Sequence, residues 1–423
     1  MSAIFTLEVL TMSYVERWQT SSIKKALDTR RVVILAGARQ SGKTTASKKE
    51  FVDAQTEYRT LDDKLLLQAA VDDPNDFVRR RNNGLMIIDE IQKAVDLLPA
   101  IKKAVDENNT KGQYLLTGSA NIQSLPGVTE SLAGRVRKIT MRPLSQGEIL
   151  ASKPSFLGII FSNRIDDLKI KKLEKDDFIE IALRGGYPET IELDAKDRFL
   201  WHQDYIEALL DRDLKDIVNI RRKQAMKDLL GIVAAWSTKF MDISAIGSGL
   251  SIKRPTLESY LNASELLYLV DKIEPWTKTD YERVNKQAKL IFNDSGLMSS
   301  ILRWNMDDVR LNSDRLGKLI ETHVGNELQK HADASNGEFY IFQYRDREKR
   351  EIDFIIENNN GDLLGIEVKS NTVVGSAEFK HLKWFKENLV KDGKSFTGIV
   401  LYTGKELVSF GPGLWAIPVN ALY

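Results

Sequence analysis

The stretch GARQSGKT, residues 37–44, follows the apolar run RVVIL and precedes a polar segment with helical character. It matches the pattern G-x-x-x-x-G-K-[ST] at every position. A glycine-rich loop between a strand and a helix lets successive backbone N–H groups surround phosphate oxygens at the helix N-terminus. Lys43 would contact the β- and γ-phosphates of a nucleotide, and Thr44 would bind Mg²⁺. The residues expected to contact the nucleotide are Gly37, Ala38, Arg39, Gln40, Ser41, Gly42, Lys43, Thr44 and Thr45.

Two acids, Asp89 and Glu90, end a second apolar run, GLMIIDE at 84–90. Asp89 would complete the Mg²⁺ site and Glu90 would polarise the attacking water. This acid pair favours hydrolysis over the phosphate transfer of a small kinase, although a solvated strand end is the alternative. At the end of the next apolar run, Thr117 or Ser119 would sense the γ-phosphate, unless the two residues only shape a turn.

Arg135, in SLAGRVRKI, is a candidate to stabilise the charge on a transferred phosphoryl group. We expect it to act in the site of a neighbouring subunit, which requires a homo-oligomer. An arginine at the protein surface with no catalytic role is the alternative that the sequence leaves open.

A second group of charged residues lies near the C-terminus. In GIEVKS, residues 365–370, Glu367 and Lys369 are two positions apart and share one face of a strand. Asp353 lies on the preceding strand, because the turn NNNGD separates the two runs. Two further acids, Glu321 and Glu327, lie in the predicted helix that precedes these strands.

This order of Asp, hairpin and Glu-x-Lys resembles the PD-(D/E)xK nucleases. There, two carboxylates hold Mg²⁺ against the scissile phosphate and the lysine positions or activates water. The resemblance also implies a glutamate from a preceding helix, which would be Glu321, with Glu327 as the alternative. The proline of that motif is replaced here by Ile352. A solvated Glu–Lys pair on an amphipathic strand is the alternative interpretation.

Four regions would position these residues. Strands alternating with helices predict a parallel-sheet α/β domain over about 14–150. A mostly helical lid or linker follows at 151–225, interrupted by the loop RGGYPE at 184–189. Residues 226–300 have the pattern of a helix-turn-helix followed by a wing. Residues 310–423 begin with a long helix and continue as strands of a second α/β domain.

The helix-turn-helix pattern rests on one apolar helix face, made of Leu257, Tyr260, Leu261 and Leu267. The segment carries nine Lys and Arg and nine Asp and Glu, so it lacks the basic surface of a strong DNA-binding domain. DNA and a protein partner therefore remain alternatives. The residues expected to contact phosphates are Lys253, Arg254, Lys286 and Lys289.

The motifs GARQSGKTT, IIDEIQKA, LLTGSAN, LAGRVRKITMRPLSQGE and RGGYPE, in this order, resemble AAA+-type ATPases of bacteria and archaea. That family pairs an ATPase domain with a C-terminal domain of unknown function numbered 4143. The resemblance covers nearly the whole chain. It implies an ATP-binding AAA+ core, a winged helix and a nuclease-like C-terminal domain, and it implies no physiological role.

Composition limits the class of protein. The 423 residues suffice for about two to four domains, and a net charge of +1 gives no overall attraction to polyanions. The chain contains no cysteine, which excludes disulfides and thiolate metal sites. Because no apolar stretch approaches ~18 residues, we expect no membrane span and a cytoplasmic protein that starts at Met1 or Met12.

Three functions are consistent with these features. The first is an oligomeric ATPase that couples Mg²⁺-dependent hydrolysis to DNA or a partner. The second is an ATP-regulated, metal-dependent nuclease. The third is a nucleotide-dependent interaction scaffold whose nuclease fold is inactive.

Overall fold

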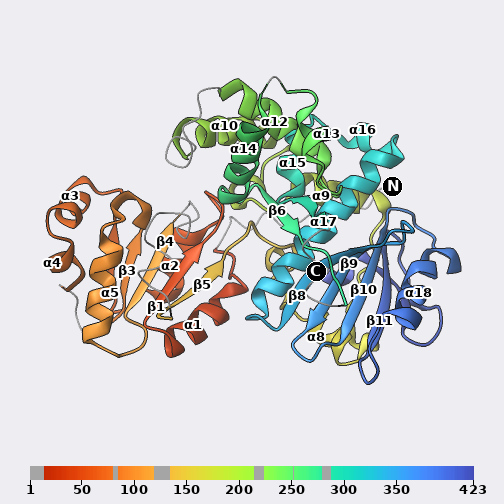
Figure 1. The fold of residues 1–423 in the computed structure, drawn as a ribbon, viewed down its shortest axis with the longest axis horizontal. Helices are drawn as coiled ribbons and strands as arrows, with labels where there is room; N and C mark the ends of the chain where they lie inside the picture. The colour runs from red at the N-terminus through yellow and green to blue at the C-terminus, as the bar shows by residue number, and fades with distance from the viewer. Residues whose placement is uncertain (1–13, 80–83, 119–133, 214–222, 251, 279–286) are drawn as a thin grey trace.

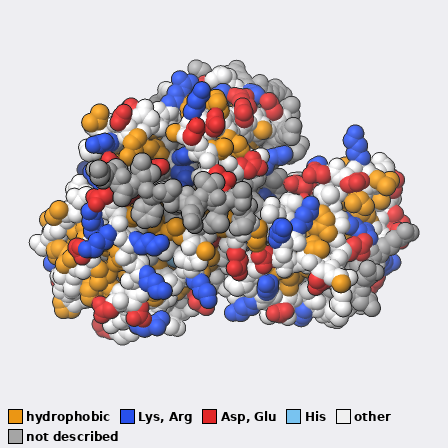
Figure 2. Space-filling model, turned by 180° about the vertical axis from the view of Figure 1, so that it is seen from behind, with side chains coloured by type: hydrophobic (Ala, Val, Ile, Leu, Met, Phe, Trp, Pro, Cys, Tyr) orange, Lys and Arg blue, Asp and Glu red, His pale blue; other side chains and the backbone are white. Residues whose placement is uncertain are grey.

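The computed structural model has three parts: a parallel-sheet lobe, a helical region and a second sheet (Figure 1). One long helix lies between the helical region and the second sheet. Lys and Arg are interspersed with Asp and Glu over the face shown in Figure 2. Among the described residues, no helix is both long enough and apolar enough to cross a membrane. The described residues are 14–79, 84–118, 134–213, 223–250, 252–278 and 287–423.

Five described strands form a parallel sheet in the order β2-β3-β4-β1-β5. The strands are β1 (Val32–Ala36), β2 (Glu57–Thr60), β3 (Met86–Asp89), β4 (Tyr114–Gly118) and β5 (Val136–Thr140). The apolar runs are buried on both faces, as in sheets covered by helices on both sides. The helices of this lobe are α1 (Gln19–Thr29), α2 (Lys43–Phe51), α3 (Lys64–Asp72), α4 (Pro74–Arg79) and α5 (Leu97–Glu107).

Two separate apolar clusters show that helices cover both faces of this sheet, so the lobe has three layers. Ile23 of α1 and Ala46 of α2 pack against one face of the sheet. Ile101 and Val105 of α5 pack against the other. Because the C-terminal ends of parallel strands lie at the same side of a sheet, the loop after β1 and the acids at the end of β3 lie close to each other.

The region between the two sheets is mainly helical. The predicted apolar face of residues 254–267 is buried, and the helix is followed by an antiparallel strand pair. The elements are α7 (Gln146–Ile149), α8 (Phe156–Phe161), α9 (Lys175–Arg184), α10 (Ala195–Ala208), α12 (Lys223–Trp236), α13 (Ile243–Gly247), α14 (Arg254–Leu266), β6 (Val270–Ile273), β7 (Lys289–Phe292), α15 (Ser295–Ile301) and α16 (Met306–Arg310).

The basic residues of this region differ in exposure. Lys253 and Arg254 are exposed at the start of α14, and Lys286 lies outside the described residues. Lys289, which was also expected to contact phosphates, is only 1% exposed. That expectation was wrong, because the ammonium group of Lys289 points into the protein and pairs with carboxylates there.

Six described strands form the C-terminal sheet, in the order β12-β13-β11-β10-β9-β8. The strands are β8 (Phe339–Arg345), β9 (Glu351–Asn358), β10 (Leu363–Lys369), β11 (Phe396–Tyr402), β12 (Val408–Ser409) and β13 (Leu414–Pro418). β9 and β10 form the predicted antiparallel hairpin. The helices α17 (Ser313–Ala334) and α18 (Lys380–Asn388) pack against opposite faces of this sheet, so the region is the α/β unit that the sequence predicted.

The long helix α17 lies at the centre of the molecule, between the helical region and the C-terminal sheet (Figure 1). Thirteen of its 22 residues are buried, and many of these are polar. A buried polar side chain requires a hydrogen-bonding or charged partner. The polar residues of α17 therefore show which other segments the helix holds.

Candidate nucleotide site and C-terminal acidic centre

The glycine-rich loop connects the end of β1 to the start of α2. A Cβ atom at Gly37 would lie 2.0 Å from the carbonyl oxygen of Met141, so a side chain there would collide with backbone. The two segments are held together because the Met141 N–H donates to the carbonyl of Ala36 at 2.7 Å. Gly42, with φ of 93°, adopts the left-handed conformation directly before α2.

The side chain of Lys43 points back into the phosphate loop. Its Nζ donates to the carbonyl oxygens of Gly37 and Ala38 at 3.0 and 2.7 Å, and the residue is 6% exposed. The ammonium group therefore lies where the loop amides would surround a phosphate chain. Phosphate oxygens would compete with these neutral carbonyls, because charge-assisted hydrogen bonds are stronger.

Asp89 is the centre of a hydroxyl network at the end of β3. Its carboxylate accepts from Thr44 Oγ1 at 3.1 Å and from the Tyr58 hydroxyl at 2.7 Å. The Thr117 hydroxyl is a third donor to the same carboxylate. Mg²⁺ prefers oxygen ligands, so Thr44 and Asp89 form a donor set that fits this ion.

Tyr58 was not identified from the sequence. Burial and the neighbouring Asp89 carboxylate raise the pKa of Tyr58 above its usual value, so its hydroxyl remains protonated and donates. Of the two residues considered as sensors, Thr117 is buried beside Asp89. Ser119 lies outside the described residues.

Glu90 follows Asp89 in the left-handed conformation, with φ of 60° and ψ of 43°. This conformation is uncommon for a residue other than glycine and often marks a functional position. Burial raises the pKa of the Glu90 carboxyl, and a hydrogen bond from the Gln92 amide partly offsets this effect. The backbone thus aims Glu90 differently from a regular strand residue.

Arg135 and the phosphate loop lie at opposite ends of neighbouring strands. It directly precedes β5, whose first residue Val136 pairs with Val32 at the start of β1. The loop begins after Ala36, so roughly 13 Å of strand separate the two ends. The Arg135 guanidinium pairs with Asp106 at 2.5 Å. Arg135 therefore lies away from the phosphate loop of its own chain.

Arg17 contacts the phosphate loop and was not identified from the sequence. Its guanidinium donates to the Ser41 carbonyl at 2.6 Å, to the Arg142 carbonyl at 2.7 Å and to Glu148 at 2.9 Å. It is 3% exposed, and it ties the phosphate loop to the segment MRPLSQGE. Its partner Glu148 lies in a quoted motif, but Arg17 is more than 100 residues away from it.

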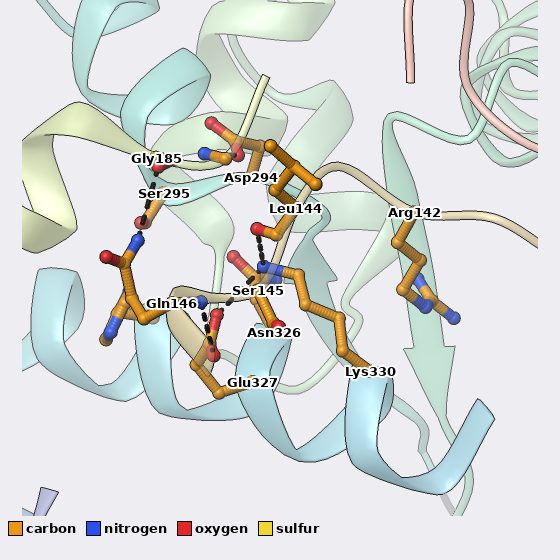
Figure 3. Close-up of polar contacts among 12 residues, drawn as sticks. Arg142, Leu144, Ser145, Gln146, Gly185, Asp294, Ser295, Asn326, Glu327 and Lys330 are labelled. Carbon is orange, nitrogen blue, oxygen red and sulfur yellow. Dashed lines mark hydrogen bonds and ion pairs between the residues drawn. The ribbon is translucent and has the colours of Figure 1, made fainter. Parts of the chain in front are cut away.

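The segment PLSQGE is held by α17 (Figure 3). Lys330 donates to the Leu144 carbonyl at 3.0 Å and pairs with Glu327 at 2.9 Å. Glu327 also accepts from the backbone N–H of Gln146 at 3.0 Å. One turn further along α17, Asp333 pairs with Arg142 at 2.6 Å. The alternative role of Glu327 in the acidic centre was wrong, because its carboxylate is used here.

The loop RGGYPE packs against the same segment. The Leu144 N–H donates to the Gly186 carbonyl at 2.7 Å, and the Gly186 N–H donates to Asp294 at 2.8 Å. Arg184 donates to the Gln146 side chain at 2.6 Å. The two motifs therefore form one junction with α17, and Arg17 connects this junction to the phosphate loop through the Arg142 and Ser41 carbonyls.

The C-terminal centre brings together Glu321 of α17, Asp353 of β9, and Glu367 and Lys369 of β10. Lys369 pairs with Glu367 at 2.9 Å, and Asp353 accepts from the backbone N–H of Val368 at 2.9 Å. Burial raises the pKa of Glu321 to about 7 and the pKa of Glu367 to about 8. These carboxyls are therefore partly protonated near neutral pH.

A fifth charged residue, Lys289 of β7, lies among these carboxylates. Its Nζ is 2.5 Å from Glu321, 3.2 Å from Asp353 and 3.7 Å from Glu351. Burial alone would lower the pKa of Lys289, but Glu321 and Asp353 outweigh it and raise the pKa. Among the described residues, no group of three or more His, Cys, Asp or Glu side chains is arranged to hold a metal ion.

Two features define a P-loop nucleoside triphosphatase domain: a parallel sheet with a phosphate loop after β1, and an acid at the end of β3 that accepts a hydrogen bond from the threonine of that loop. In agreement, residues 29–150 match the AAA domain family. Residues 175–308 and 316–422 match two domains of unknown function, DUF8612 and DUF4143. The chain thus carries an AAA-type P-loop ATPase domain and a DUF4143 domain, as its motifs predicted.

The chain is similar to uncharacterized proteins of Mycobacterium bovis and Mycobacterium tuberculosis. Each is 26% identical over 373 residues, which is 86% of this chain and 76% of the relative. Among solved structures, a Walker-type ATPase of Pyrococcus abyssi is 13% identical, with a TM-score of 0.39 over 69% of this chain and 96% of that one. A signal transduction ATPase of Pyrococcus horikoshii, with a tetratricopeptide repeat sensor, is 14% identical, with a TM-score of 0.26 over 76% of this chain and 47% of that one.

Proposed function

We propose that the chain binds ATP at residues 37–45 and hydrolyses it with Mg²⁺. The observation that carries this proposal is the 3.1 Å contact between the Thr44 hydroxyl and the Asp89 carboxylate, beside the buried ammonium group of Lys43. Thr44 and Asp89 would hold the Mg²⁺, which supplies positive charge to the β- and γ-phosphates. Hydrolysis of ATP by the full chain, lost on removal of Mg²⁺ with EDTA, tests the proposal.

The residues around this site have separate roles in the proposal. Lys43 leaves the Gly37 and Ala38 carbonyls and contacts the phosphates. Tyr58 and Thr117 orient Asp89 through their hydroxyl groups. Glu90 accepts a proton from the attacking water, since a positioned carboxylate is a general base.

Substitution of Glu90 by glutamine is expected to preserve ATP binding and to slow turnover by about 10²–10⁴-fold. The amide keeps the size of the side chain but cannot accept the proton. Phosphate release measures turnover, and displacement of a fluorescent ATP analogue measures binding. Glu107→Gln is the matched control, because Glu107 is an exposed acid at the end of α5. Equal turnover in Glu90→Gln and wild type would remove Glu90 from the reaction.

The proposed assembly is a homo-oligomer in which Arg135 enters the neighbouring site. The position of Arg135 across the sheet from its own phosphate loop supports this arrangement. An arginine supplied by another chain is a common way to stabilise phosphoryl transfer.

Mixed oligomers test the role of Arg135. Arg135→Ala and Lys43→Ala are each expected to be inactive alone, and mixing them is expected to restore part of the activity. One interface of the mixture pairs an intact phosphate loop with an intact arginine. Arg79→Ala is the control, since Arg79 also forms an exposed pair with an α5 acid, Glu107. Confirmed mixed oligomers without recovered activity would contradict the role across subunits.

The proposed output of hydrolysis is a change in binding of DNA or a protein partner in the cytoplasm. Lys253 and Arg254 are exposed at the start of α14, which supports a surface for phosphates. The balanced charge of the segment favours a protein partner equally. ATP turnover with and without duplex DNA distinguishes the two, because only a DNA-coupled enzyme is stimulated by DNA alone.

A further inference from the structure

We propose that Lys289 takes the place of a divalent cation in the C-terminal acidic centre. The centre, defined as Glu321, Glu351, Asp353, Glu367 and Lys369 with Lys289, is then an internal ion-pair network and not a metal-dependent nuclease site. It joins β7 to α17 and to the C-terminal sheet. This inference is independent of the proposed ATP site.

The position of the Lys289 ammonium group is the first support. It is 1% exposed and contacts three carboxylates that come from two different elements, α17 and β9. Mg²⁺ would need several of the same oxygens at ~2.0–2.1 Å in an octahedral arrangement. The Lys289 ammonium group would compete with a divalent cation for these oxygens, and the two positive charges would repel each other at this distance.

The use of the remaining oxygens is the second support. One oxygen of Asp353 accepts from the Val368 N–H and the other faces Lys289. Glu367 is paired with Lys369, whose Nζ lies 2.9 Å away. Each carboxylate that the nuclease resemblance assigns to a metal therefore already has a partner within the chain.

Charge balance is the third support. The centre contains four carboxyl groups and two lysines. The two ammonium groups offset two of the four carboxylate charges, and burial raises the pKa of Glu321 and Glu367. In contrast, Lys289 and Lys369 lower the pKa of Asp353 against the effect of burial, so this carboxylate is ionised and paired. Lys289 and Lys369 thus supply, from within the chain, positive charge that a divalent cation would otherwise supply.

The origin of Lys289 gives the network its structural role. Residue 289 lies in the part matched by DUF8612, whereas the carboxylates lie in the part matched by DUF4143. Removing one partner of a buried charge pair is strongly destabilising, because the other charge stays buried. Lys289 therefore holds the helical region against the C-terminal sheet.

Binding of Mn²⁺ to the full-length protein tests the proposal. The variants are Lys289→Met, which removes the charge but retains a long side chain, Asp353→Asn, and the double variant. Electron paramagnetic resonance counts bound Mn²⁺ in the absence of nucleotide, and thermal unfolding reports its effect on Tm. ATP hydrolysis, measured on the same samples, monitors the separate nucleotide site.

Wild type is expected to bind no Mn²⁺ at a site that requires Asp353. Lys289→Met is expected to have a lower Tm, to gain one Mn²⁺ that the double variant lacks, and to recover Tm when Mn²⁺ is added. No plasmid nicking by wild type is expected with Mg²⁺ or Mn²⁺.

Two results would overturn the proposal. One is wild-type binding of Mn²⁺, or wild-type nicking, that Asp353→Asn abolishes. The other is a folded Lys289→Met that gains no Mn²⁺ site. Where Lys289→Met fails to fold at all, the comparison of wild type with Asp353→Asn still decides between a closed centre and a metal site.

Discussion

Substitution of Lys43 by alanine is expected to reduce ATP hydrolysis by about 10²–10³-fold or more, because it removes a preorganised positive charge from the developing charge on the phosphates. Lys43 is the buried cation that faces the inside of the phosphate loop, where it now contacts the carbonyls of Gly37 and Ala38. Phosphate release over a range of ATP concentrations measures the loss. The same substitution should weaken ATP binding, which equilibrium titration measures separately.

Lys49→Ala is the matched control for this substitution. Lys49 is an exposed lysine in the last turn of the same helix, α2, so the control removes the same charge without touching the loop. Circular dichroism and Tm show whether either variant has lost its fold. If a folded Lys43→Ala hydrolysed ATP as fast as Lys49→Ala, residues 37–44 would not be the nucleotide site.

Substitution of Gly186 by alanine is expected to destabilise the fold by about 3 kcal/mol or more, at or above the upper end of the range for overpacked sites. A Cβ at this position would lie 2.1 Å from the Leu144 carbonyl oxygen. The Leu144 N–H donates a hydrogen bond to the Gly186 carbonyl, which holds the two backbone segments close together. One of the two segments must therefore move to relieve the contact. Such a movement would also disturb the Gly186 hydrogen bond to Asp294.

Gly231→Ala is the control for a glycine substitution as such. A Cβ at Gly231 would meet no heavy atom of the described residues within 4 Å, apart from its own helix α12 and its chain neighbours. Alanine there is expected to be neutral or to stabilise the helix by about 0.5–1 kcal/mol. Urea unfolding followed by tryptophan fluorescence measures both variants. Equal midpoints for Gly186→Ala and wild type would show that the junction tolerates the displacement.

The Gly186 variant also tests whether the junction supports the nucleotide site. Leu144 and Arg142 lie in one segment, and Arg17 connects that segment to the Ser41 carbonyl in the phosphate loop. A folded Gly186→Ala protein should therefore bind ATP more weakly than Gly231→Ala. This weakening would occur although Gly186 has no assigned role in the chemistry.

The sequence by itself determined the parts of the protein that depend on local pattern. The apolar runs and glycine spacing identified the strands, the phosphate loop and the acids at 89–90, because strand burial and tight loops depend on residues close in the chain. The same reasoning placed Asp353 beside Glu367, since a short turn connects their strands. An apolar helix face predicted the burial of Leu257 and Tyr260.

The tertiary structure alone decided which distant residues complete each site. Tyr58 and Thr117 reach Asp89 from separate strands, and Arg17 reaches the phosphate loop from a segment before α1. Lys289 illustrates the physical reason most clearly. In the sequence it is a single lysine in an apolar strand, and nothing local shows whether its charge faces solvent or protein. Its role follows from burial beside carboxylates more than 30 residues away, because a buried charge is stable only where packing supplies its opposite.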